Sequence, residues 1–319
     1  KMTWTYQQAA PIPLFIAIDQ EGGRVNRLKE KYGFPRSLTA RALGKAGSLD
    51  SVRFYSEAMA ANLAGLGINV NFAPCVDVAV NPKNEVIVKV ERSFSSNADS
   101  VALLAQEYIR QHRKYGVITS LKHFPGHGSS LEDTHFGVAD VTNTWTENEL
   151  KPYQLLLNAG YVDAVMTSHI VNKKLDSKGL PGTLSKEILD GILRQKLGFQ
   201  GVVFSDDMQM HAITKQYGLE ESIKLAIQAG VDILCFSNNI AGSETRTVDR
   251  VFEIIRAAVD KGEISKERID QSFARIMSLK KRLTQNEAEY YRQQIREIEA
   301  QALQQRRLAE ENARQAFER

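Results

Sequence analysis

The sequence predicts a parallel α/β fold, a TIM-type (β/α)8 barrel lacking its first one or two strands. Short apolar runs without polar alternation recur along the chain, as in parallel strands that are buried on both faces. Amphipathic helical patterns separate these runs, and polar residues close them, so their ends would converge on one rim. A closed barrel of this type needs eight strands. The runs number six: Leu14–Asp19, Ile68–Pro74, Val117–Leu121, Asp163–His169, Val202–Asp206 and Asp232–Ser237.

Helix boundaries between the runs are readable from glycines and capping residues. Gly116 and similar glycines precede most of the apolar runs and suit the ends of helices. The stretch Asp99–Tyr115 is predicted to be helical because its apolar residues, such as Val101 and Tyr108, recur on one face. Ser185 is a suitable N-cap for a following helix that contains Ile188.

The composition is that of an ordinary globular protein. Of 319 residues, 43% are hydrophobic and 25% charged, and 41 basic residues nearly balance 38 acidic ones, for a net charge of +3. This balance gives no electrostatic reason to expect nucleic acid or an acidic membrane as a partner. We expect no membrane span, since no stretch approaches the ~20 apolar residues required. We expect a cytoplasmic location, or a periplasmic or secreted one if an upstream signal has been removed. The oligomeric state stays open.

The two cysteines, Cys75 and Cys235, lie in strand-like apolar runs. We predict buried free thiols and no disulfide framework. The histidines of the loop around His127 follow the pattern H-x3-H-x7-H, which lacks the spacing of the common zinc sites. The spacing disfavours a metal site, but Glu132 and Asp133 could supply oxygen ligands, so a catalytic metal is the alternative at this point; we expect no cofactor.

The chain changes character at about Leu283. Residues 284–319 are charged, rich in Gln and free of Pro and Gly, with apolar residues such as Tyr291, Ile295 and Ile298 on one helical stripe. We predict a barrel domain over residues 1–283 and a charged C-terminal helix over 284–319. This helix would pack on the barrel or extend into solvent, and a coiled-coil or partner helix is the alternative.

The densest chemistry lies in the loop Lys122–His135, which reads KHFPGHGSSLEDTH and follows an apolar run. Its Asp133-Thr134-His135 segment suggests a carboxylate that orients an imidazole, and histidine is the natural proton shuttle at neutral pH. The alternative is an incidental pair of polar loop residues.

Asp206 closes another apolar run and would lie at the mouth of the barrel. It is a candidate nucleophile, metal ligand or helix cap. Asp207 is an equal candidate on residues alone, because neighbouring strand residues point in opposite directions.

The segment Asp19–Arg27 follows the first run and contains the pair Gly22-Gly23, which lets the backbone approach a ligand closely. It matches neither a GxGxxG nor a Walker loop, which disfavours nucleotide binding. The alternative is a tight turn with surface charges. Arg92 alone would indicate only a solvated cation.

Together these segments resemble glycoside hydrolase family 3, and within it the single-domain β-N-acetylglucosaminidase (beta-hexosaminidase) branch. The resemblance covers about residues 12 to 283. It rests on IDQEGGRVNR, NFAPCVDV, NPKNEVIVKVERSF, KHFPGHG with DTH, MTSHI, LPGTLS, FSDDM and ERIDQSFARIMSLKKRL, in this order along the chain.

The resemblance implies a retaining double displacement. Asp206 would be the nucleophile that forms a covalent glycosyl-enzyme, and Asp207 would be structural. His135 would be the acid/base, oriented by Asp133. The residues carried over as sugar contacts are Asp19, Arg27, Arg92, Lys122 and His123. The family needs no metal.

The implied reaction is removal of terminal β-linked N-acetylglucosamine from peptidoglycan fragments or chito-oligosaccharides. A phosphorylase is the alternative enzyme, because a histidine acid/base leaves room for phosphate where a carboxylate would repel it. An inactive sugar-binding relative is the non-enzymatic alternative.

Three departures from the family pattern stand out. Ser129-Ser130 replaces the commoner Asp-Thr, Glu91 stands where the family often has Gly, and the first strands, which should precede Leu14, are absent.

Overall fold

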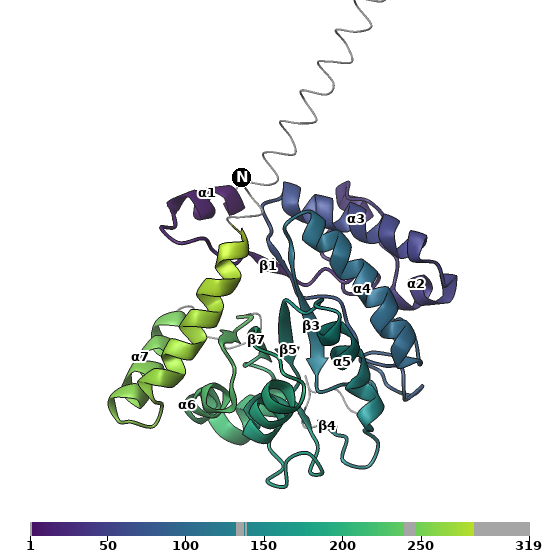
Figure 1. Ribbon diagram of the computed structural model, residues 1–319. Coiled ribbons are helices and arrows are strands. Elements are labelled where there is room, and N and C mark those ends of the chain that lie inside the picture. The colour runs from purple at the N-terminus through teal and green to yellow at the C-terminus, as the bar shows by residue number, and fades with distance from the viewer. Residues whose placement is uncertain (1, 132–136, 138, 239–246, 284–319) are drawn as a thin grey trace, which may run out of the picture.

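The computed structural model describes residues 2–131, 137, 139–238 and 247–283. Its centre is a six-stranded, wholly parallel sheet with the order β1-β2-β3-β5-β7-β8 (Figure 1). The strands are β1 (Ala17–Ile18), β2 (Val70–Asn71), β3 (Ile118–Phe124), β5 (Ala164–Thr167), β7 (Val202–Asp207) and β8 (Ile233–Cys235). Each of the six predicted runs therefore overlaps one strand, and β3 and β7 extend beyond their runs to Phe124 and Asp207.

Helices fill the connections between the strands. The α-helices are α1 (Met2–Ala9), α2 (Ala40–Ala46), α3 (Leu49–Gly65), α4 (Ala98–Lys114), α5 (Lys151–Asn158), α6 (His211–Ala229) and α7 (Thr247–Asp260). The shorter or wider turns are η1 (Glu30–Tyr32), η2 (Glu147–Glu149), η3 (Gly182–Leu184) and the π-type helix η4 (Glu187–Lys196). A further helix covers residues 266–283. Figure 1 shows α2, α3 and α4 on one side of the central strands and α6 and α7 on the other.

Two local predictions about these helices are confirmed. The predicted helix Asp99–Tyr115 is α4, shifted by one residue at each end. The Ser185 hydroxyl accepts a hydrogen bond from the Ile188 N–H at 3.1 Å, as an N-cap at the start of η4 should.

The fold is an open part of a (β/α)8-type barrel, as predicted. Helices connect the successive parallel strands, and among the described residues no strand pairs with the outer edge of β1 or of β8. A small second sheet pairs β4 (Ala139–Asp140) with β6 (Ile170–Val171) and was not predicted, because two-residue strands leave no periodic pattern.

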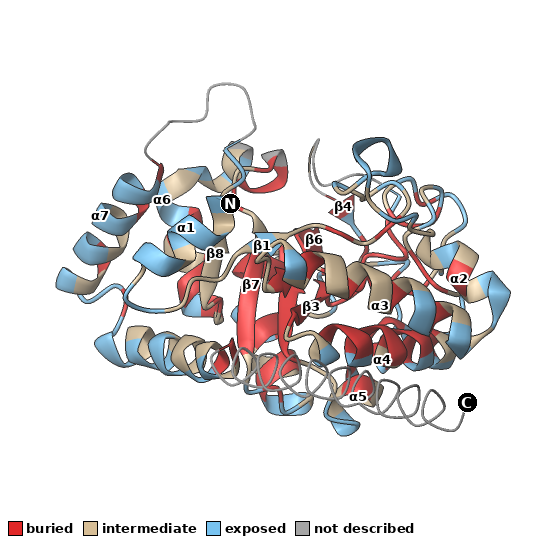
Figure 2. Cartoon of the chain, turned by 90° about the horizontal axis from the view of Figure 1, so that it is seen from above, coloured by how far each residue is buried: buried red, intermediate tan, exposed pale blue. Residues whose placement is uncertain are grey.

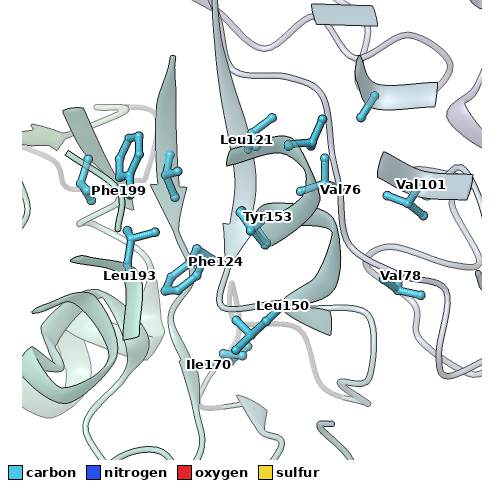
Figure 3. Packing of buried hydrophobic residues seen from close by; sticks show 14 of the residues in the cluster. Val76, Val78, Val101, Leu121, Phe124, Leu150, Tyr153, Ile170, Leu193 and Phe199 are labelled. Carbon is cyan, nitrogen blue, oxygen red and sulfur yellow. The ribbon is translucent and has the colours of Figure 1, made fainter. Parts of the chain in front are cut away.

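The main core fills the space between the sheet and its helices. Val76, Leu121, Phe124 and Tyr153 all belong to this cluster (Figure 3). The rings of Phe124 and Tyr153 meet edge to face with centroids 5.1 Å apart, a favoured aromatic geometry. Figure 2 shows the buried residues gathered in β3, β7 and α4. Apolar packing against the helices therefore holds one face of the sheet in place.

The opposite face of the sheet has its own apolar cluster. Ile118, Met166 and Phe204 lie there, and Leu279 and Leu283 from the helix of residues 266–283 pack against them. Successive strand residues point to opposite faces, so Val165 and Val203 belong to the other cluster. The last described helix therefore covers part of the face that a barrel turns inward.

Three remaining predictions concern the tail, the membrane and the cysteines. The predicted helix over 284–319 lies outside the described residues. In the described part of the chain, no helix combines the length and hydrophobicity of a membrane span. Both cysteines are free thiols, Cys75 buried as predicted and Cys235 only partly buried.

Candidate active site

The carboxyl ends of the parallel strands bring the predicted polar residues to one rim. Lys122 and His123 lie within β3, and Asp206 lies near the end of β7. Asp19 directly follows β1, and His169 lies two residues beyond β5. In parallel barrels this rim carries the active site.

Lys122 is the centre of the charged group on this rim. Its side chain is only 2% exposed, and its Nζ lies 2.7 Å from Asp19 Oδ1 and 2.7 Å from Glu21 Oε1. Burial would lower the pKa of Lys122, but the two carboxylates hold that pKa above its usual range. The ammonium group therefore stays charged and leaves the half-exposed Asp19 carboxylate facing the rim.

Arg92 is fixed by Glu21 through a bidentate pair. Its Nε and Nη2 donate to the two Glu21 oxygens at 2.9 and 2.7 Å, a geometry that orients the guanidinium plane. Burial alone would raise the pKa of Glu21, but Arg92 and Lys122 lower it to about 2. Glu21 is therefore a permanent anion that holds both cations in place.

His123 is locked between Asp77 and Arg92. Its Nδ1 lies 2.7 Å from Asp77 Oδ2, and its Nε2 lies 3.1 Å from Arg92 Nη2. Since a carboxylate accepts and a guanidinium donates, these partners assign the proton to Nδ1. Both ring nitrogens are thus used within the protein. His123 accepts a hydrogen bond from Arg92 and so helps to orient its guanidinium group. Contact between His123 and a sugar stays a prediction.

Asp206 presents one carboxylate oxygen without a partner. Oδ1 accepts the Asp207 N–H at 2.8 Å, whereas Oδ2 makes no hydrogen bond with the described residues. Burial raises the pKa of Asp206, yet the net shift is downward because His169, His123, the Asp207 N–H and Lys122 all favour the charged form. The side chain is a charged carboxylate with a free oxygen, which is what a nucleophile requires.

Asp207 has the opposite surroundings. Its Oδ1 accepts the N–H groups of Gln209 and Ser237 at 3.0 and 3.2 Å, and its Oδ2 accepts the Ser237 hydroxyl at 2.6 Å. The imidazole of His169 donates from Nε2 to the Asp207 carbonyl at 2.9 Å. These contacts join β7 to the residues after β8 and support a structural role for Asp207.

Not every predicted site residue is placed with this group. The Arg27 side chain is exposed, and among the described residues it forms no ion pair with the rim. Its backbone N–H donates to Gln20 Oε1 at 2.8 Å. Asp133 and His135 lie outside the described residues, so their predicted acid/base role stays a prediction.

Sequence reasoning missed Glu21 and Asp77, although both lie within the quoted segments IDQEGGRVNR and NFAPCVDV. Both are acidic residues in segments that follow a strand, and that is the signal that could have found them. Their partners, Arg92 and His123, are distant in sequence, so the pairing itself leaves no local pattern.

Two departures from the family pattern have visible structural consequences. Glu91 has φ 62°, in the left-handed region that favours glycine, and it directly precedes Arg92. The buried Ser130 hydroxyl lies 2.6 Å from His127 Nδ1 and accepts from Asn84 Nδ2 at 3.1 Å. Ser130 therefore belongs to the interior of the turn after β3.

Cys75, Asp77 and His123 place ligand-type atoms within 4.8 Å of one another. Metal binding needs a thiolate, but burial, followed by the charge of Asp77, raises the pKa of the Cys75 thiol well above its usual range. The Cys75 Sγ and His123 Nδ1 each donate to Asp77 Oδ2, at 3.2 and 2.7 Å. These residues fit a hydrogen-bonded network better than a metal centre.

Comparisons with known proteins identify the family of the chain. The model of the glycosyl hydrolase family 3 N terminal domain matches residues 2–279. A protein named beta-hexosaminidase A from Pseudoalteromonas piscicida is 34% identical over 88% of this chain and 50% of its own length. A beta-hexosaminidase from Tolumonas auensis is 37% identical over 75% of this chain and 71% of its own length.

Among solved structures, a family 3 beta-N-acetylglucosaminidase from Paenibacillus sp. str. FPU-7 superposes with a TM-score of 0.82. It is 38% identical, and the match covers 88% of this chain and 53% of that one. The chain thus spans about half the length of the Pseudoalteromonas and Paenibacillus proteins. By the matched domain and these relatives, the chain belongs to glycoside hydrolase family 3.

Proposed function

We propose that the chain is a retaining β-N-acetylhexosaminidase that uses Asp206 as its nucleophile. The observation that carries the proposal is the free Oδ2 of a charged Asp206 beside the cations of the rim. A carboxylate with this environment suits attack on a sugar carbon that gains positive charge in the transition state.

The reaction has two steps. In the first, an Asp206 oxygen bonds to the anomeric carbon while the bond to the leaving oxygen breaks, and that oxygen takes a proton from the acid/base, proposed as His135. In the second, water gives its proton to the same residue and its oxygen displaces Asp206. Two inversions at the anomeric carbon give net retention, and Asp133 is the proposed orienting partner of His135.

The proposed substrate is terminal β-linked N-acetylglucosamine on peptidoglycan fragments or chito-oligosaccharides. The names of the relatives support the sugar. Lys122, Arg92 and Asp19 supply charged donors and an acceptor for its hydroxyl and N-acetyl groups. Arg27 and His123 are further proposed contacts. We propose a cytoplasmic location on the sparse cysteine content of the chain, two residues in 319, with a periplasmic or secreted location as the alternative.

Product analysis tests the type of reaction. An aryl N-acetyl-β-glucosaminide is incubated with the protein with and without inorganic phosphate, and the products are followed by NMR. We expect free N-acetylglucosamine, released first as the β anomer, at a rate that phosphate does not change. A glycosyl phosphate would instead identify a phosphorylase, and no turnover would favour the inactive sugar-binding relative.

A further inference from the structure

The turn that follows β3 is held by two buried carboxylates. Its successive backbone N–H groups all point to carboxylate oxygens: His127 N–H donates to Asp77 Oδ1 at 2.8 Å, and Gly128 and Ser129 N–H donate to Glu149 Oε2 at 2.8 and 3.3 Å. Consecutive N–H groups of this kind form an anion-binding nest. Here the protein supplies both anions itself.

Glycines let the turn approach Glu149 closely. A Cβ at Gly126 would lie 2.6 Å from the Glu149 Cβ, and Gly126 has φ +121°, which L side chains rarely adopt. A Cβ at Gly128 would lie 1.7 Å from the Val78 carbonyl oxygen. Both positions therefore require glycine, and the backbone of the turn is fitted against the Glu149 side chain.

Glu149 is 0% exposed. Of its two carboxyl oxygens, Oε2 alone accepts hydrogen bonds from the described residues. Its Oε1 has no hydrogen-bonding partner within the described residues, and the same holds for the buried His127 Nε2 and Tyr153 OH. Burial raises the pKa of Glu149, whereas the Ser129 side chain lies close enough to oppose that rise. A buried polar atom without a partner is costly. An arrangement of this kind suggests a role beyond packing.

The two carboxylates differ in proton affinity. Burial would raise the pKa of Asp77, but His123 and His127 hold that pKa well below its usual range. Burial, followed by the charge of Asp77, raises the pKa of Glu149 to about 7, against the hydrogen bonds from Gly128 and Ser129. The titratable groups that interact with Glu149 are Asp77 and Tyr153, and no cation pairs with it in the described part of the chain.

We propose that Glu149 is a positioning residue that holds the turn of residues 127–129, from which the chain continues to Asp133 and His135. These two residues follow Ser130 by three and five positions, so the turn sets where the proposed acid/base segment starts. The carboxylate accepts stronger hydrogen bonds than the protonated acid. The turn is therefore held more tightly above neutral pH than below it. The catalytic part of this inference rests on the proposed glycosidase function.

Substitutions at Glu149 test the inference. Glu147 is the matched control because it lies in the same short helix, is exposed, and within the described ranges pairs only with Lys196, at 3.0 Å. We expect Glu149→Ala to lower kcat for an aryl N-acetyl-β-glucosaminide by roughly 10- to 100-fold, as a misplacement of about 1 Å can, with KM little changed. Glu149→Gln keeps an acceptor for both N–H groups, so it should restore most of kcat. It should also change the pH profile of kcat near pH 7, because the contribution of Glu149 is removed and that of the proposed acid/base His135 remains, whereas Glu147→Gln should keep the wild-type profile.

Unchanged kcat in Glu149→Ala would overturn the inference, and so would a pH profile that Glu149→Gln leaves intact. Amide hydrogen exchange of the peptide that spans residues 126–131 tests, independently of enzyme activity, whether Glu149 holds the turn. We expect protection to fall in Glu149→Ala and to lose its pH dependence in Glu149→Gln; equal protection in all variants contradicts the inference. If the folded wild type fails to turn over substrate, the proposed function fails, while exchange still decides whether Glu149 holds the turn.

Discussion

The two ends of the parallel sheet both bury charged groups, but they satisfy them differently. At the amino end, Asp163 precedes β5 and Asp232 precedes β8, and both side chains are 0% exposed. Asp163 Oδ1 lies 2.6 Å from an Arg113 nitrogen and 2.7 Å from an Arg282 nitrogen. At the carboxyl end, Asp206 Oδ2 has no hydrogen-bond partner among the residues that the structure describes.

At the amino end, both carboxylate oxygens of Asp232 have hydrogen-bond or ion-pair partners. Its Oδ2 accepts from Arg194 Nη2 at 2.8 Å and from the Val203 N–H at 3.0 Å. Its Oδ1 accepts the Ser272 hydroxyl at 2.7 Å and lies 3.2 and 3.3 Å from Arg275 and Arg268 nitrogens. Both oxygens are occupied, which leaves none for a ligand.

Three of the arginines come from one helix at a constant spacing. Arg268, Arg275 and Arg282 are seven residues apart and therefore lie on one face of the helix of residues 266–283. They tie this helix to the amino end of the sheet. A buried carboxylate whose two oxygens both have partners stabilises the fold. A carboxylate beside cations with one oxygen that lacks a partner among the described residues can react with a ligand.

Asp206→Ala gives the largest expected effect and is the sharpest test of this division. We expect turnover of an aryl N-acetyl-β-glucosaminide to fall by roughly 10⁴-fold or more, because the covalent route is lost. The melting temperature should stay close to that of the wild type. Steady-state assays and thermal melts measure both, with the exposed Asp99→Ala as the control. Activity that survives in Asp206→Ala would contradict the assignment.

His135→Ala should have the next largest effect. The proposed acid/base contributes roughly 10²–10⁴-fold to the rate, and the loss should be smallest for substrates with acidic leaving groups, which need little protonation. Rates for a series of aryl N-acetyl-β-glucosaminides measure this dependence. A uniform loss across the series would argue against acid catalysis by His135.

Asp232→Ala, at the amino end of the sheet, should lower the free energy of unfolding and leave the activity of the folded protein unchanged. Removing the carboxylate leaves Arg194, Arg268 and Arg275 without their buried counter-charge, at a cost of about 3–5 kcal/mol. Denaturant unfolding measures the loss, and kcat of the folded fraction should not change. A variant as stable as the wild type would show that the arginine cluster does not hold the last helix.

Acid should weaken the amino end by a smaller amount. Burial would raise the pKa of Asp163, but Arg282 and Arg113 shift that pKa below its ordinary value of 3.8. A depressed pKa contributes stability above 3.8 that is lost as the pH falls through the folded-state value. The difference in unfolding free energy between wild type and Asp163→Asn should therefore shrink as the pH falls below 3.8. A stability gap that persists undiminished there would contradict this account.

The strands and their polar ends were predictable because their signals are local. Each apolar run carries its own pattern, and residues such as Lys122 and Asp206 simply end a run. The residues that hold the site were not predictable. Glu21, Asp77 and Glu149 act on partners far away in the sequence, and their burial follows from the assembled fold. Glu21 and Asp77 lie in segments that follow strands, but nothing in the sequence around Glu149 distinguishes it from a surface acid.

The choice between Asp206 and Asp207 shows the same limit. The strand pattern left both candidates open, and only the resemblance to family 3 favoured Asp206. The structure separates them by partners: Asp207 uses both carboxylate oxygens on Gln209 and Ser237, whereas Asp206 uses one.

Mass spectrometry of a trapped intermediate tests the central claim most directly. The protein is incubated with a slow fluorinated N-acetylglucosaminyl donor, digested and sequenced by fragmentation. We predict one covalent glycosyl adduct, on Asp206. An adduct on Asp207, or turnover of the donor with no trapped intermediate, would contradict the claim that Asp206 is the nucleophile.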